Sequence, residues 1–78
     1  MSLTNIRRGV MMMIGLSREF LVELEPNLAT SYNAQLNDFE WALDVAYLDR
    51  DRDEAVRILH AVDTFSEKLL GDLKQIAA

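Results

Sequence analysis

The sequence contains no cysteine, one proline, one histidine and three glycines in 78 residues. Without cysteine, disulfide bonds and thiolate metal sites are excluded, and the composition fits a reducing, cytoplasmic compartment. A domain of this length buries only roughly 60–65% of the surface that its unfolded chain exposes, so its stability is marginal without added support. Because disulfides are excluded, a second protein chain is the leading candidate for that support.

Basic residues are missing from the middle of the chain. Residues 19–49 carry seven acids and no lysine or arginine, whereas residues 1–18 carry three arginines and no acid. The formal net charge is −5. An acidic stretch of this kind repels a phosphate backbone, which argues against nucleic-acid binding, and it attracts a basic protein surface. The alternative interpretation is a solvated acidic face that keeps the protein soluble.

Long hydrophobic runs are also missing. The apolar stretch at residues 10–16 is too short to cross a bilayer. It follows two arginines, as the apolar part of a signal peptide does, but Arg18 and Glu19 interrupt it and no small-residue cleavage site follows. We therefore expect a cytoplasmic protein that does not interact with a membrane.

Apolar residues recur at intervals of three and four in three segments, which predicts an all-α fold. The expected helices cover residues of about 4–24, 28–48 and 53–76. Thr4 is the expected cap of the first helix. Pro26 ends that helix because the residue before a proline is pushed out of the helical conformation. The third helix is expected to begin at a cap provided by Asp51 or Asp53.

Helices of this length with short connectors predict a single domain, residues 1–78, folded as an up-down-up three-helix bundle. Residues 37–40 have the pattern of a capping box, so a break near Asn37 that gives four helices is an alternative. The first helix is apolar nearly all round at residues 10–14, whereas a helix of an isolated bundle should leave one side polar. This excess of apolar surface predicts that the bundle self-associates.

The charged residues form no complete catalytic or metal-binding motif. Asp49, Asp51 and Asp53 match the start of a calcium loop, but its sixth and twelfth positions hold Glu54 and His60 instead of glycine and glutamate. His60 has no second ligand at helical spacing. Acidic pairs at four-residue spacing lack the concave pocket that acid–base catalysis needs in so small a bundle. We expect no enzymatic activity, metal, cofactor or small-molecule substrate.

Two surfaces remain as candidates for protein binding. One is the apolar side of the first helix, whose candidate residues are Met11, Met12, Met13, Leu16 and Phe20. Methionine adapts to irregular partner surfaces, but these side chains could instead fill the centre of the bundle. The other candidate is an acidic face with an aromatic anchor, formed by Glu40, Trp41 and Asp44. Here the alternative is that Trp41 covers the third helix of its own chain.

These surfaces lead to two functional hypotheses. The first is a small acidic protein-binding module, such as an inhibitor, an immunity-type protein or an adaptor, that holds a basic partner through the acidic segment. The second is a structural or regulatory homodimer assembled through the first helix, without catalytic activity. Both predict a protein partner, either a different chain or a second copy of this one.

Overall fold

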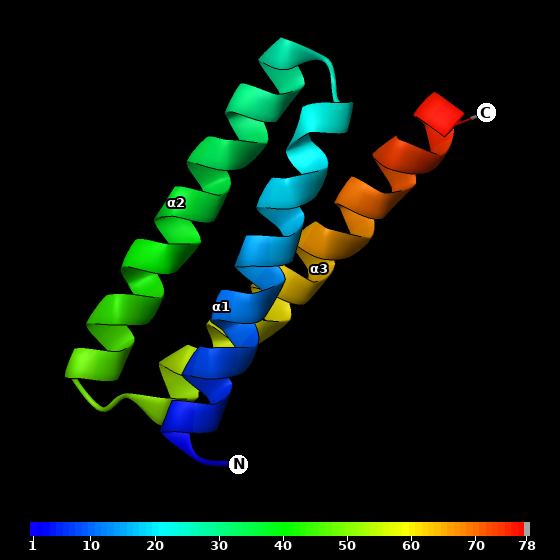
Figure 1. Cartoon of the computed structure of the whole chain (residues 1–78). Coiled ribbons are helices and arrows are strands. Elements are labelled where there is room, and N and C mark those ends of the chain that lie inside the picture. The colour runs from blue at the N-terminus through cyan, green and yellow to red at the C-terminus, as the bar shows by residue number, and fades with distance from the viewer. Residues whose placement is uncertain (78) are drawn as a thin grey trace.

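The computed structural model describes residues 1–77 and contains helices but no strand over that range. The elements are α1 (Leu3–Phe20), a short 3₁₀ helix η1 (Leu21–Glu23), α2 (Pro26–Leu48) and α3 (Arg52–Ala77). α1 and α2 lie side by side and are joined at one end of the molecule, while α2 and α3 are joined at the opposite end (Figure 1). The expected all-α fold with three long helices is confirmed.

The first helix begins earlier and ends earlier than the sequence predicts. Ser2, not Thr4, is its cap, because the Ser2 Oγ accepts a hydrogen bond of 3.1 Å from the backbone N–H of Asn5. Thr4 lies inside the first turn. The earlier start places Leu3 in the helix, where it packs against the core.

The expected end of the first helix at residue 24 is replaced by the tighter η1 turn. In a 3₁₀ helix, residues three apart lie on one side, so Leu21 and Leu24 are both buried. Glu25 then adopts an extended conformation before Pro26, as proline requires, and caps α2 by accepting a 2.9 Å hydrogen bond from the N–H of Asn27. Pro26 occupies the first turn of α2, where its missing N–H costs nothing.

The second helix runs without interruption through Asn37, so the alternative with a break at that residue is wrong. α2 ends in a Schellman motif, in which the N–H of Asp51 donates to the carbonyl of Ala46 and the N–H of Arg50 donates to that of Tyr47. The backbone of Arg50 adopts the left-handed conformation at this turn, with φ of 55°, where glycine is the usual residue. Asp51, one of the two expected caps of the third helix, accepts a 3.0 Å hydrogen bond from the N–H of Glu54.

The core lies along the line where the three helices meet, and it is almost entirely aliphatic. Its centre consists of side chains with almost no exposed surface: Ile6, Val10, Ile14, Leu36, Leu43 and Val62. An aromatic cluster closes the seam between α2 and α3. The ring of Phe65 packs edge-to-face against Tyr32 at 5.2 Å and against Phe39 at 5.8 Å between ring centroids. The bundle is elongated, with extents of 42 × 20 × 15 Å.

Candidate protein-binding surfaces

The outward side of α1 carries a row of large apolar side chains. Met12, Leu16 and Phe20 follow one another at four-residue intervals, so they share one side of the helix, and they are 62%, 55% and 45% exposed. A neighbouring side of α1 is already buried in the core through Ile6, Val10 and Ile14. α1 is therefore apolar on two sides, and its own chain covers only one of them.

The three consecutive methionines have three different environments. Met12 is exposed, whereas Met11 and Met13 are half-buried and pack against the core. Met13 faces the seam with α3, and Met11 lies beside Arg8 in a shallow hollow on the outer surface. Of the five residues predicted for a partner-binding face, the structure brings Met12, Leu16 and Phe20 together as an exposed row and uses Met11 and Met13 partly for the fold.

A cleft between α1 and α3 lies directly beside this row. Its volume is about 200 Å³, and it is lined by Met13, Leu16, Ser17, Phe20, Ser66, Leu69 and Leu70. The two serines contribute its only polar side chains, and their Oγ atoms lie 3.4 Å apart. Leu70 is half-exposed at its edge. Sequence reasoning missed Leu70, although its place beside the buried Leu69 already set it off the core-facing row of the third helix.

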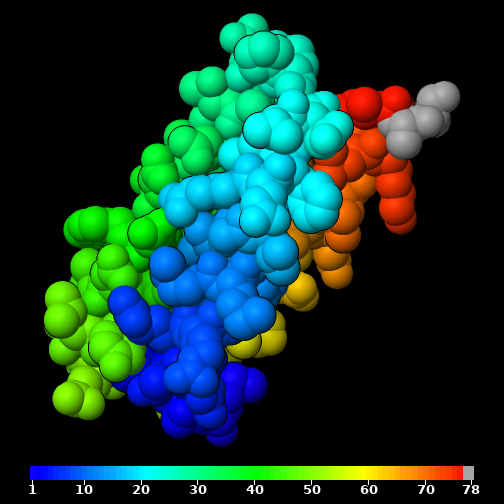
Figure 2. Space-filling view, in the orientation of Figure 1, coloured from blue at the N-terminus to red at the C-terminus, as the bar shows by residue number. Residues whose placement is uncertain are grey.

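We call the exposed row and this cleft together the α1–α3 apolar surface. It consists of Met12, Leu16, Phe20 and Leu70 on the outside, with Met13 and Leu69 beneath them. Figure 2 shows α1, in blue to cyan, along the near face of the molecule, with the C-terminal part of α3 emerging beside it. No residue that lines the cleft carries a charge or an imidazole, so the cleft has the chemistry of an apolar docking site.

Charged side chains flank the exposed row, and the sign of their charge differs between its two ends. Arg8 lies one helical turn before Met12, and Glu19 and Glu23 lie near the Phe20 end. All three charged residues are exposed and form no ion pair within residues 1–77. One end of the row is therefore basic and the other acidic.

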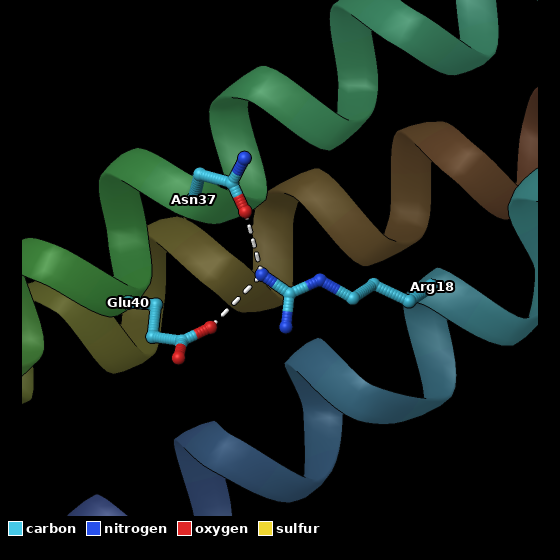
Figure 3. Close-up of polar contacts among 3 residues, drawn as sticks. All are labelled: Arg18, Asn37 and Glu40. Atoms are coloured by element: carbon cyan, nitrogen blue, oxygen red, sulfur yellow. Dashed lines mark hydrogen bonds and ion pairs between the residues drawn. The ribbon is translucent and has the colours of Figure 1, made fainter.

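The other two arginines of α1 are used within the chain. The Arg18 Nη2 donates to Asn37 Oδ1 at 2.8 Å and lies 2.9 Å from Glu40 Oε2 (Figure 3). Arg7 lies 3.7 Å from the Asp44 carboxylate, and its guanidinium stacks over the ring of Tyr47 at 4.7 Å. These contacts connect α1 to the acidic side of α2.

Trp41 is 71% exposed, so the alternative in which it covers the third helix of its own chain is wrong. It forms an outward row on α2 with Val45 and Leu48, which are also exposed. Its predicted acidic companions, Glu40 and Asp44, lie beside it in a shallow hollow, but both carboxylates are engaged by arginines of α1. The structure thus assembles the predicted group and also neutralises much of its charge.

One tyrosine in the α2–α3 seam has an altered acidity. The Tyr32 hydroxyl donates a hydrogen bond to the Asp72 carboxylate, and Lys68 lies over the tyrosine ring at 5.5 Å. Burial, together with the hydrogen bond to Asp72 and its negative charge, raises the pKa of Tyr32 from 10.0 to about 12. The neutral phenol therefore persists at physiological pH and links α2 to the C-terminal part of α3.

Residues 1–77 show neither a metal-binding cluster nor a membrane-spanning helix. His60 is exposed, and residues 1–77 contain no cluster of three or more histidine, aspartate or glutamate side chains arranged to hold a metal ion. Over the same range, each helix is too short or too polar to traverse a bilayer. Comparisons of the chain with protein-family models, with curated proteins and with solved structures find no match.

Proposed function

We propose that this protein is a non-catalytic protein-interaction module that docks through the α1–α3 apolar surface. A single observation carries the proposal: Met12, Leu16 and Phe20 are about half-exposed in one row of a helix whose other side already fills the core. Large apolar side chains grouped beside an apolar cleft are typical of protein-binding surfaces. A partner helix laid along such a row would remove these side chains from water.

The composition of the surface supports binding rather than catalysis. The cleft offers two serine hydroxyls, Ser17 and Ser66, and no group that could act as a general base toward them. His60, the only histidine, does not line the cleft. We therefore also propose that the protein has no enzymatic activity. We further propose that it acts in the cytoplasm, which agrees with its lack of cysteine.

The up-down-up order of the helices belongs to the same proposal. The connectors at residues 24–25 and 49–51 are too short to cross the length of the molecule, and they lie at opposite ends of it (Figure 1). In that order, the outward side of α1 is covered by neither α2 nor α3, and Met12, Leu16 and Phe20 lie on it.

The experiment that tests this proposal is site-specific photo-crosslinking in the native cell. A benzophenone amino acid placed at Leu16 should give a discrete covalent adduct with another polypeptide, because this side chain would be covered by the partner. The matched control is the same amino acid at His60, an exposed residue of α3 outside the surface. Absence of an adduct at Leu16, or equal adducts at the two positions, would reject the α1–α3 apolar surface as a docking site.

A second candidate function is recognition of a basic partner through α2. It is favoured by the 71% exposure of Trp41, in a row with Val45 and Leu48, on a segment without a single lysine or arginine. The pairing of Glu40 and Asp44 with arginines of α1 weakens it, because the acids must be shared or released when a basic partner binds.

The lone tryptophan makes this second candidate directly measurable. Trp41 fluorescence can be titrated with a synthetic amphipathic helix of leucine and lysine and with a matched helix of leucine and glutamate. A saturable change with the lysine peptide alone supports basic-partner recognition by α2. If the two peptides behave alike, the acidic face does not select a basic partner and the candidate fails.

A further inference from the structure

The charges beside the exposed row of α1 identify a specific occupant for it. Arg8 is exposed at the N-terminal end of the row, and Glu19 and Glu23 are exposed at its C-terminal end. None of the three forms an ion pair within the part of the chain that the structure describes. A surface with one basic end and one acidic end is complementary to itself when a second copy is turned end over end.

We infer that the α1–α3 apolar surface, whose docking role rests on the proposed function above, binds a second copy of this chain with the two α1 helices antiparallel. The two-fold axis passes near Leu16, so that Leu16 of one copy meets Leu16 of the other. Met12 of each copy then lies against Phe20 and the cleft of the other. Arg8 of each copy reaches the acidic end formed by Glu19 and Glu23.

The antiparallel arrangement is selected over the parallel one by electrostatics. With parallel helices, the two Arg8 side chains would lie at the same level of the interface, and the two acidic ends would also lie at one level. Like charges placed opposite one another in an interface oppose association. With antiparallel helices, the Arg8 end of each copy lies at the level of the Glu19–Glu23 end of the other.

The shape of the surface fits the same arrangement. Phe20 lines the cleft, and the long and flexible side chain of Met12 from the second copy would enter the cleft beside it. Gly15 is also exposed on α1, and apart from its chain neighbours and its own helix backbone no atom lies within 4 Å of where a Cβ would stand, so this side of the helix is open to a second chain.

Single cysteines test the register, because the natural chain contains none. Leu16→Cys should form a disulfide-linked dimer under mild oxidation. Met12→Cys alone should not, because the two Met12 positions would be separated by roughly 12 Å along the helix axis, beyond the roughly 7 Å limit between Cα atoms. Mixing Met12→Cys with Phe20→Cys should give the mixed dimer.

The control and the contrary results of this test are well defined. His60→Cys, also exposed, should remain monomeric in the same oxidation. Efficient self-linking of Met12→Cys would show that the helices are parallel, and it would overturn the inferred register. Equal linking of Leu16→Cys and His60→Cys would show random collision and would overturn the inference altogether.

Charge reversal tests the electrostatic part of the inference by sedimentation equilibrium. Arg8→Glu should raise the dimer dissociation constant by about tenfold, because it places like charges together. Reversal of the acidic end, Glu19→Arg with Glu23→Arg, should do the same. The combined variant should return to within about threefold of the natural chain. If instead the penalties simply add, Arg8 does not face the acidic end and the antiparallel pairing is wrong.

Failure of this inference can be distinguished from failure of the proposed function. A natural chain that stays monomeric at about 100 µM excludes the second copy as the occupant. If the photo-crosslinker at Leu16 still captures a different polypeptide in the native cell, the docking function stands with another partner. If neither a dimer nor an adduct forms, both proposals fail.

Discussion

The two seams of α3 are built differently. Along α2, the ring of Phe65 packs edge-to-face with Tyr32 and Phe39, and the Tyr32 hydroxyl is bonded to Asp72. Along α1, the seam passes the Ser17–Ser66 contact and opens into an apolar cleft of about 200 Å³. Large rings fill the α2–α3 seam beneath a shallow hollow that is lined partly by polar and charged side chains, and we call it the closed seam. The α1–α3 seam is incomplete where its apolar cleft lies, and we call it the open seam.

This difference between the two seams explains how a chain rich in apolar residues leaves an apolar surface exposed. α3 is longer than α1, with 26 residues against 18, and its C-terminal end diverges from α1 (Figure 1). The aromatic cluster and the Tyr32–Asp72 bond hold that part of α3 to α2. On the α1 side, Leu16, Phe20 and Leu70 then stay about half-exposed, and we propose that a second copy covers them.

The largest expected effect comes from breaking the closed seam. Phe65→Ala removes a buried ring that contacts two others, and it should lower the free energy of unfolding by about 3–5 kcal/mol. Urea denaturation followed by circular dichroism measures this loss. Leu70→Ala, in the open seam, is the matched control and should cost about 1 kcal/mol or less, since the side chain is half-exposed. Equal losses would mean that the two seams are equally closed.

The next largest expected effect is on the dimer dissociation constant, and it comes from a change beside the open seam. Leu16→Glu places a charge in the proposed dimer interface and should raise the dimer dissociation constant at least about a hundredfold, or about 2.7 kcal/mol. The fold itself should lose less than about 0.5 kcal/mol, because Leu16 is 55% exposed in a single chain. Light scattering and circular dichroism separate the two quantities. A Leu16→Glu variant that unfolds would show that this residue belongs to the core.

The sequence was sufficient to predict the helices because local patterns determine them. Buried positions such as Ile6, Val10, Leu36 and Val62 recur with the helical period, and Pro26 marks the end of the first segment. The ends of helices were less predictable, because neighbouring residues can serve equally well as caps. Ser2 and Thr4 are both good caps, and the burial of Leu3 favours the earlier one.

The candidate surfaces were predicted only in part, because exposure depends on how the helices cross. Phe20 shares a helical row with core residues in the sequence, yet it is 45% exposed because it lies at the cleft between α1 and α3. The acidic companions of Trp41 were identified, but their pairing with Arg7 and Arg18 depends on the register of α1 against α2. No local sequence pattern determines the register of α1 against α2.

A smaller effect is expected from the polar bond that closes the α2–α3 seam. Tyr32→Phe removes the hydroxyl that donates to Asp72 and should lower the free energy of unfolding by about 1 kcal/mol at neutral pH. The raised pKa of Tyr32 also predicts a dependence on pH. The folded state holds the proton more tightly than the unfolded chain does, so this contribution is complete below pH 10 and is lost as the pH rises from 10 to about 12.

Comparison of variants isolates this titration from that of other groups. Unfolding by urea at a series of alkaline pH values should show a steeper loss of stability for the natural chain than for Tyr32→Phe. Tyr47→Phe is the control, because the Tyr47 hydroxyl forms no hydrogen bond to the residues that the structure describes. Identical slopes for the natural chain and Tyr32→Phe would show that the bond to Asp72 does not contribute to holding the seam closed.

The smallest expected effect distinguishes the two exposed apolar rows of the molecule. Trp41→Ala removes the one aromatic side chain of the outward row on α2, which Trp41 forms with Val45 and Leu48. The free energy of unfolding and the dimer dissociation constant should both stay nearly unchanged, within about 0.5 kcal/mol. The reason is that Trp41 contacts neither the cleft nor the core, whereas its charged neighbours keep their own pairs with α1. Sedimentation equilibrium of Trp41→Ala beside Leu16→Glu compares the rows directly. If the tryptophan variant loses the dimer and the leucine variant retains it, the association surface lies on α2, and the open seam of α3 has another role.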